Sequence, residues 1–281
     1  MIFLSAIVAA ILSAQPVEVS LWTDEFPQPD EVEDKADAKI FIHHPVKPNG
    51  TAAIICPGGG YRGQVMGAEG HGIAEWLGKY GITGIVLKYR LPKGRSFVPL
   101  ADAQRAVRLA RHHAREWKID AKRLGIVGFS AGGHLASTAA THFPQSGEPT
   151  AKNPFERISC RPDFAILVYP VVTMGEFTHT GSKRNLLGAN PNQKWIDHFS
   201  NEKRVTKETP PIFMAHAVDD RPVPPENSRM LYAALQKKNI PSKYMELPDG
   251  GHGLNGYKGP SWDAWQTGSI QWLKEIVILS K

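Results

Sequence analysis

The feature that most constrains this chain is a steady alternation between short apolar runs and stretches with helical periodicity. Seven runs are candidate strands, and most of them have the unbroken apolar character of strands that are covered on both faces. They are residues 39–43, 51–56, 82–89, 124–129, 164–169, 211–216 and 243–247. Strand and helix in alternation predict an α/β fold, with a mostly parallel central sheet flanked by helices and joined by right-handed crossovers.

The predicted helices are recognised by apolar side chains that recur three and four positions apart and therefore share one face. One stripe is Ile73, Trp76, Leu77 and Tyr80, a second is Ala103, Val107, Ala110, Ala114 and Trp117, and further helices are expected over 134–141, 228–238 and 262–279. We find no repeat, low-complexity tract or long linker, so a single domain is expected over residues 18–281.

Residues 171–209 interrupt this rhythm, because they are rich in polar residues, Gly and Pro, with short helices expected only near 184–187 and 193–199. In an open α/β sheet, ligands bind beyond the carboxyl ends of the strands. An insertion after the strand 164–169 would lie over that edge. We therefore predict a small lid-like segment that faces the substrate.

The first fourteen residues are uncharged and almost wholly apolar, but they are shorter than the ~20 residues that span a bilayer. We predict a signal peptide over residues 1–14 and a secreted or periplasmic location, although the positive charge usual in such a segment is missing. A buried first strand or a wrongly assigned start is the alternative interpretation.

Charge and cysteine content exclude several function classes. The net charge of +6 is spread along the chain, which indicates a solvated surface and no nucleic-acid partner. Only two cysteines occur, Cys56 and Cys160, so neither a disulfide framework nor a zinc site made of several thiolates is possible. Whether these two cysteines bond to each other is left open.

A serine lies between small residues in Gly128-Phe129-Ser130-Ala131-Gly132-Gly133, directly after the strand 124–129 and before a helix. In this context G-x-S-x-G forms a sharp, strained turn that holds the serine hydroxyl at the end of the sheet. The motif therefore predicts Ser130 as a nucleophile. A glycine-rich turn without chemistry is the alternative.

A serine hydroxyl is a poor nucleophile unless a histidine accepts its proton and a carboxylate orients that histidine. Of the eleven histidines, His252 lies between glycines in a loop just after the last predicted strand. Asp220 follows the strand 211–216, and its neighbour Asp219 remains an alternative. We expect His134 to pack near the serine, and we expect surface or core roles for His43, His44, His112 and His113.

The segment Cys56-Pro57-Gly58-Gly59-Gly60-Tyr61 follows the strand 51–56. Glycines let backbone N–H groups approach a ligand without a Cβ in the way, as donors to an oxyanion require. The N–H of Ala131 would be a second donor. A phosphate cradle is disfavoured, because the loop lacks the Lys-Ser/Thr of a P-loop. Since the chain supplies nucleophile, base and donors, we expect no metal or organic cofactor.

Together these motifs resemble the α/β-hydrolases, and specifically the secreted bacterial esterases that are acetylxylan-esterase-like, near the feruloyl-esterase and hormone-sensitive-lipase-like branches. The resemblance covers nearly all of the chain after residue 14 and also rests on residues 86–91, 209–211 and 223–228. It implies Ser130 as nucleophile, Asp220 as orienting carboxylate and His252 as base. It further implies Gly59, Gly60 and Ala131 as oxyanion donors. Pro57 stands where the lipase-like branch has His, which argues against that branch.

The resemblance and the predicted export imply an acetylated polysaccharide such as xylan, or a small ester, as substrate. We expect Tyr61 to wall the pocket because it adjoins the glycine loop. Trp195 is a candidate for stacking on sugars, whereas Trp262 and Trp265 share a helical face and are expected in the core. The alternatives are a prolyl-oligopeptidase-type peptidase, a lipase for long acyl chains and an inactive carbohydrate-binding protein. The sequence predicts no oligomeric state.

Overall fold

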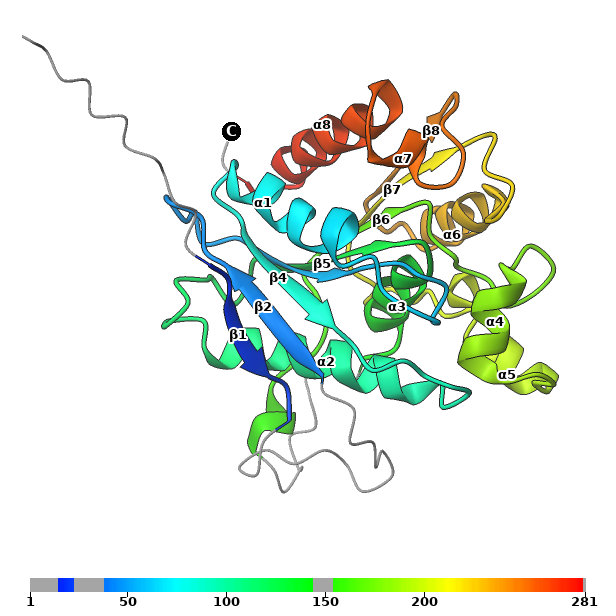
Figure 1. The fold of residues 1–281 in the computed structure, drawn as a ribbon, viewed down its shortest axis with the longest axis horizontal. Helices are drawn as coiled ribbons and strands as arrows, with labels where there is room; N and C mark the ends of the chain where they lie inside the picture. Colours follow the sequence, from blue (N-terminus) through cyan, green and yellow to red (C-terminus); the bar gives the residue numbers. More distant parts are fainter. Residues whose placement is uncertain (1–14, 23–37, 144–153, 280–281) are drawn as a thin grey trace, which may run out of the picture.

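The computed structural model describes residues 15–22, 38–143 and 154–279, so the predicted signal peptide over 1–14 lies outside the described residues. Within these ranges, eight strands form one sheet in the order β1-β2-β4-β3-β5-β6-β7-β8 (Figure 1). The strands are β1 (Val17–Ser20), β2 (Lys39–His43), β3 (Ala52–Cys56), β4 (Thr83–Lys88), β5 (Leu124–Phe129), β6 (Ala165–Val168), β7 (Ile212–Ala217) and β8 (Ser242–Leu247). The pairs β1·β2 and β2·β4 are antiparallel, and the other pairs are parallel. The predicted α/β architecture is confirmed.

All seven predicted strands are present, with ends shifted by at most one residue. Strand β1 was not predicted; it is an edge strand with the residues Val-Glu-Val-Ser and no buried side chain. Its short alternating pattern carries too little apolar signal to stand out from a loop. The central strands β3, β5, β6 and β7 are buried at every position, as parallel strands covered on both faces should be.

Helices cover both faces of the sheet (Figure 1). The α-helices are α1 (Gly72–Gly78), α2 (Phe97–His112), α3 (Ser130–Thr141), α4 (Thr180–Leu187), α5 (Gln193–His198), α6 (Glu226–Lys237), α7 (Leu254–Tyr257) and α8 (Pro260–Glu275). Shorter turns are η2 (Gly67–His71), η3 (Pro154–Arg157) and η4 (Asn201–Lys203). No helix within the described ranges combines the length and the apolar character needed to cross a bilayer.

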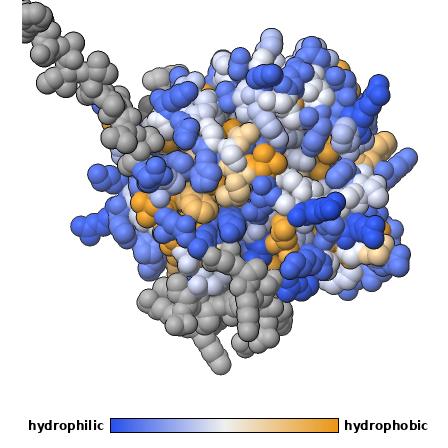
Figure 2. Space-filling model, in the orientation of Figure 1, coloured by the Kyte–Doolittle hydropathy of each residue, from blue (hydrophilic) through white to orange (hydrophobic). Residues whose placement is uncertain are grey.

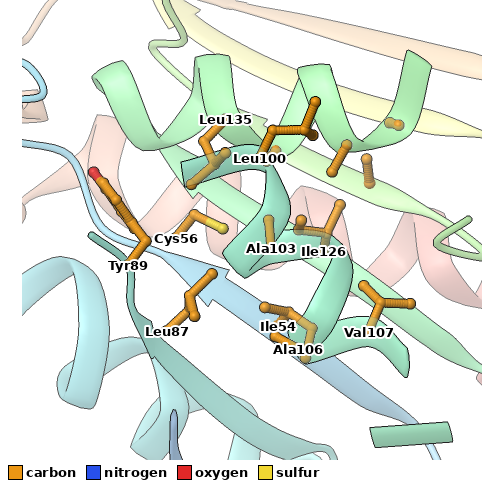
Figure 3. Close-up of a cluster of buried hydrophobic side chains, with 14 of the residues drawn as sticks. Ile54, Cys56, Leu87, Tyr89, Leu100, Ala103, Ala106, Val107, Ile126 and Leu135 are labelled. Atoms are coloured by element: carbon orange, nitrogen blue, oxygen red, sulfur yellow. The ribbon is translucent and has the colours of Figure 1, made fainter. Parts of the chain in front are cut away.

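The core has two parts, one on each face of the sheet. On one face, side chains of β3, β4 and β5 meet those of α2 and α3, as Figure 3 shows for Ile54, Leu87 and Ala103. On the other face, α1 and α8 pack against the sheet, with Trp262 and Trp265 buried as predicted. On the face drawn in Figure 2, polar residues predominate and apolar residues form small separate patches.

Three helix ends differ from the sequence prediction. Helix α2 ends at His112, so Ala114 and Trp117 lie beyond it in a run of tight turns that ends with Lys118 at a φ of 55°. These turns still carry Trp117 into the core. Helix α1 ends at Gly78, which leaves Tyr80 exposed, and α8 ends at Glu275 rather than at residue 279.

The segment 171–209 contains α4, α5 and η4 and is tied by three polar side chains to α3 and to the residue that follows it. The ring of His134 donates from Nε2 to the carbonyl of Phe199 over 2.8 Å, and that of His142 donates from Nε2 to the carbonyl of His198 over 2.9 Å. The amide of Asn201 donates to the Ser137 hydroxyl over 2.7 Å. These bonds hold the segment along α3, from His134 to the residue that follows its last turn.

His134 makes the free energy of unfolding depend on pH. Burial lowers the pKa of His134 from 6.5 to about 4. Its pKa is thus depressed in the folded state, so on acidification the unfolded chain takes up the proton first. We expect the free energy of unfolding to fall by about 2 kcal/mol between pH 7 and pH 5 on account of this group.

The variant His134→Gln keeps a donor and an acceptor but does not titrate. Urea denaturation at pH 7 and pH 5 should therefore show a smaller loss of stability for His134→Gln than for the wild type, with a difference of about 2 kcal/mol. Equal losses for the two proteins would contradict the burial of a neutral imidazole at this position.

Candidate active site

Ser130 occupies a strained turn at the junction of β5 and α3. Its φ is 52°, in the left-handed region that residues with a Cβ rarely adopt, while the backbone of Phe129 before it is extended. The flanking glycines are required by close contacts. A Cβ on Gly128 would lie 2.3 Å from the carbonyl oxygen of Gly132, and a Cβ on Gly132 would lie 2.1 Å from that of Cys56. The predicted turn is therefore present, and it presses the start of α3 against the loop after β3.

The structure brings Ser130, His252 and Asp220 together in a chain of hydrogen bonds. Ser130 Oγ lies 2.8 Å from His252 Nε2, and His252 Nδ1 lies 2.8 Å from Asp220 Oδ2. The three residues follow β5, β8 and β7, and the carboxyl ends of these parallel strands lie at one edge of the sheet. Asp219 is placed differently, since it is exposed and accepts the N–H of Gly251 over 2.9 Å.

Asp220 is held as an anion. Its side chain is buried, which opposes ionisation, but hydrogen bonds from His216 and His252 and the N–H of Val223 lower its pKa to about 2. His216 Nε2 lies 3.2 Å from Asp220 Oδ2 and 2.9 Å from the carbonyl of Val223. Because both partners accept, the proton is on Nε2, and the Ser228 hydroxyl donates to Nδ1. His216 was not predicted from the sequence as part of the site.

The glycine loop after β3 adjoins the serine. Gly59 and Gly60 have φ values of 133° and 64°, and both line the same cavity as Ser130 and His252. Within the described part of the chain, the N–H groups of Gly59, Gly60 and Ala131 donate to no protein acceptor. The N–H of Gly58 is already engaged, since it donates to Glu69 Oε2 over 2.6 Å.

Tyr61 does not take the place that the sequence analysis expected. Its φ of 58° turns the side chain under the glycine loop, where only 2% of it is exposed. Its hydroxyl donates to His134 Nδ1 over 2.9 Å, because the other ring nitrogen of His134 already carries a proton. The expectation that Tyr61 walls the pocket is therefore corrected: it supports the loop from within the core.

The cavity above Ser130 has a volume of about 720 Å³, within the range usual for sites that bind small molecules. Its lining is Gly59, Gly60, Arg62, Val65, Glu69, Ser130, His179, Gly181, Arg184, Asn185, Pro222, His252 and Tyr257. Four of these residues come from the segment 171–209, which thus forms one wall. Among the described residues, no group of three or more His, Cys, Asp or Glu side chains is arranged to hold a metal ion.

Glu69 lines the cavity and was not predicted from the sequence. Only 3% of it is exposed, and besides Gly58 it accepts the hydroxyl of Tyr169 over 2.9 Å. One signal was available in the sequence: Glu69 precedes Ile73 by four positions and so extends the buried stripe of that helix. A carboxylate on the buried face of a helix indicates that hydrogen-bond donors lie beside it in the folded protein.

Other residues singled out in the sequence lie away from this cavity. His43 pairs with His71, with 2.9 Å between Nε2 and Nδ1. Trp195 is 38% exposed and packs edge-on against Phe97. Cys56 is a buried free thiol, so the two cysteines are not joined.

The close contact at Gly132 generates a stability prediction. Gly132→Ala forces a methyl group against the carbonyl groups of Cys56 and Pro57, and we expect it to lower the free energy of unfolding by about 1–3 kcal/mol. Gly78→Ala is the matched control, because a Cβ there meets no atom within 4 Å in the described structure and should stabilise α1 by about 0.5–1 kcal/mol. Urea denaturation measures both. Equal effects of the two variants would contradict the contact.

Comparison with known proteins places this geometry in a family. The sequence model of the BD-FAE family matches residues 39–235. The chain is 40% identical over 220 residues to endo-1,4-beta-xylanase B of Butyrivibrio fibrisolvens, covering 76% of this chain and 34% of that protein. It is 34% identical over 252 residues to an acetylxylan esterase of Xylanibacter ruminicola, covering 86% and 49% respectively. The chain thus spans between a third and a half of the length of these relatives.

Two solved structures are also similar. The acetyl ester-xyloside bifunctional hydrolase of Caldicellulosiruptor lactoaceticus is 36% identical, with a TM-score of 0.88 over 96% of this chain and 100% of that chain. A thermophilic esterase of Thermogutta terrifontis shares the fold, with a TM-score of 0.74 over 96% of this chain and 95% of that chain, at 22% identity. The resemblance to acetylxylan-esterase-like hydrolases is confirmed. The chain belongs to the BD-FAE family and has the α/β-hydrolase fold.

Proposed function

We propose that this chain is a serine carboxylic-ester hydrolase that removes acetyl groups from xylan or from a related polysaccharide or oligosaccharide. The observation that carries the proposal is the hydrogen-bond chain from Ser130 through His252 to Asp220, at the base of a cavity that Gly59 and Gly60 also line. The names of the similar proteins, an acetylxylan esterase and an acetyl ester-xyloside hydrolase, support the same substrate class.

In the acylation step, His252 Nε2 takes the proton of Ser130 Oγ as this oxygen attacks the ester carbonyl carbon. The Asp220 carboxylate stabilises the imidazolium that forms and keeps its Nδ1–H in place. The carbonyl oxygen becomes an oxyanion, which the N–H groups of Gly59, Gly60 and Ala131 stabilise. The bond to the sugar oxygen then breaks, and His252 returns the proton to the departing hydroxyl.

Deacylation repeats these roles with water in place of the serine. His252 removes a proton from a water molecule, which attacks the acetyl carbonyl of the acyl-enzyme. The same three N–H groups stabilise the second oxyanion, and the proton returns to Ser130 Oγ as acetate leaves. Nucleophile, base and oxyanion donors are then all supplied by the chain.

The cavity lining favours a sugar ester over a long-chain lipid ester. The wall from the segment 171–209 presents His179, Gly181, Arg184 and Asn185, and Arg62 also lines the cavity. The side chains of His179, Arg184, Asn185 and Arg62 offer hydrogen-bond donors to a sugar. We take residues 171–209 as a lid-like part of the domain 18–281 and residues 1–14 as an export signal, so that the enzyme meets its polymer outside the cytoplasm.

The first test measures acetate release from acetylated xylan and from an aryl acetate, for the wild type and for Ser130→Ala. We expect the wild type to cleave both substrates and Ser130→Ala to lose at least about 10⁴-fold in kcat on each. Cleavage of the aryl acetate alone would contradict the substrate assignment. Cleavage of a prolyl peptide in preference to either ester would favour a peptidase instead.

The adjacent aspartates offer a matched pair. Asp220→Asn should lower kcat for the aryl acetate by about 10⁴-fold, because the amide favours the wrong tautomer of His252. Asp219→Asn keeps an oxygen that accepts the Gly251 N–H, so kcat should stay within about 10-fold of the wild type. Comparable losses in the two variants would refute the assigned role of Asp220.

A further inference from the structure

One buried acidic group at this cavity has no part in the steps proposed above. Glu69 lies at the cavity wall with only 3% of its surface exposed, and burial raises the pKa of its carboxyl group. A buried carboxylate costs free energy unless donors surround it. The presence of such a group at the cavity wall therefore needs a physical explanation.

The groups that stabilise the Glu69 carboxylate come from three separate segments of the site. The N–H of Gly58, in the glycine loop after β3, donates to Oε2 over 2.6 Å. The hydroxyl of Tyr169, the residue after β6, donates to Oε1 over 2.9 Å. The hydroxyl of Tyr257, at the end of the loop that carries His252, also interacts with the carboxylate. One side chain thus connects three loops.

Each of these contacts borders a reacting group. A Cβ built on Gly58 would lie 2.6 Å from Glu69 Oε2 and 2.9 Å from the Cβ of Ser130, so this residue separates the carboxylate from the nucleophile by a single backbone unit. Gly59 and Gly60, the oxyanion donors in the proposed function, come directly after Gly58. The ring of Tyr169 lies edge-on to the ring of His252, with 5.0 Å between the centroids.

The segments that Glu69 joins have strained backbone conformations, which contacts with other parts of the chain must stabilise. Tyr169 has a φ of 39° and Tyr257 has a φ of 67°, both in the left-handed region that residues with a Cβ avoid. In the loop of His252, Leu254 and Asn255 also have positive φ values. A hydrogen bond to an ionised acceptor is roughly twice as strong as one to a neutral acceptor. A carboxylate is therefore suited to holding such loops.

We propose that Glu69 is a positioning residue, which fixes the glycine loop and the histidine loop relative to Ser130 through its contacts with Gly58, Tyr169 and Tyr257. The inference rests on the proposed function for its chemistry, since it assigns Glu69 to the geometry of the oxyanion donors and the base. Glu69 itself touches no reacting atom. Its loss should lower the rate of the chemical step and leave substrate binding nearly unchanged.

The test compares Glu69→Leu with Glu69→Gln, using kcat and KM for an aryl acetate, corrected for the folded fraction from thermal unfolding. Leu fills the space but accepts no hydrogen bond, and Gln still accepts the Gly58 N–H. We expect Glu69→Leu to lower kcat about 100-fold, as the loss of one oxyanion donor does, with KM within about threefold of the wild type. Glu69→Gln should recover about tenfold of that loss.

Asp163→Leu is the matched control for a role in stability alone. Asp163 also accepts a backbone N–H, that of Leu124 over 2.9 Å, but it lies at the opposite end of β5 from Ser130. We expect Asp163→Leu to lower the unfolding temperature while kcat of the folded enzyme stays within about twofold of the wild type.

A second readout keeps this inference separate from the proposed function. An aryl phosphonate that labels Ser130 needs the same nucleophile, base and oxyanion donors, but it needs no ester turnover. Labelling in Glu69→Leu should slow about as much as kcat, and Tyr257→Phe should show a smaller decrease in the same direction. If Glu69→Leu is labelled and turns over at the wild-type rate, the inference is overturned. If wild-type Ser130 is labelled but no ester is hydrolysed, only the proposed function fails.

Discussion

The parallel pairing of β3, β5, β6, β7 and β8 is the constraint on which the whole site depends. In a parallel set, the carboxyl ends of neighbouring strands lie at one edge, and here every such end delivers a different group. These groups are the glycine loop after β3, Ser130 after β5, Tyr169 after β6, Asp220 after β7 and His252 after β8. Residues far apart in the chain, such as Ser130 and His252, meet at 2.8 Å only because the sheet fixes where their strands end.

Strain accumulates at this edge and is balanced by packing elsewhere. Ser130, Tyr169 and Tyr257 all have positive φ values, each of which costs about 1–3 kcal/mol. Two clusters of buried apolar side chains, one on each face, pack against the strands beneath them. Polar anchors such as His134 and Asn201 hold the segment 171–209 against α3. The buried core thus stabilises a set of loop conformations that would not persist by themselves.

The sequence predicted most of the fold and the central residues of the site because their signals are local. The glycines on either side of Ser130 predict the turn there, and most of the strands are continuous apolar runs. Other features depend on partners distant in sequence. Whether Asp219 or Asp220 faces His252 depends on the path of the chain after β7. Tyr61 was misplaced because its positive φ, invisible in the sequence, turns it towards His134. Glu69 and His216 were missed because their partners, Tyr169 and Asp220, are identified only by the fold.

The account's central claim is that Ser130 carries the acyl group between the two half-reactions. It is tested most directly by rapidly quenching the enzyme during turnover of an aryl acetate and mapping the modified peptide by mass spectrometry. The account predicts that one acetyl group is attached to Ser130 and that it disappears as acetate is released. Turnover at the wild-type rate in Ser130→Ala, or acetylation confined to another residue, would contradict it.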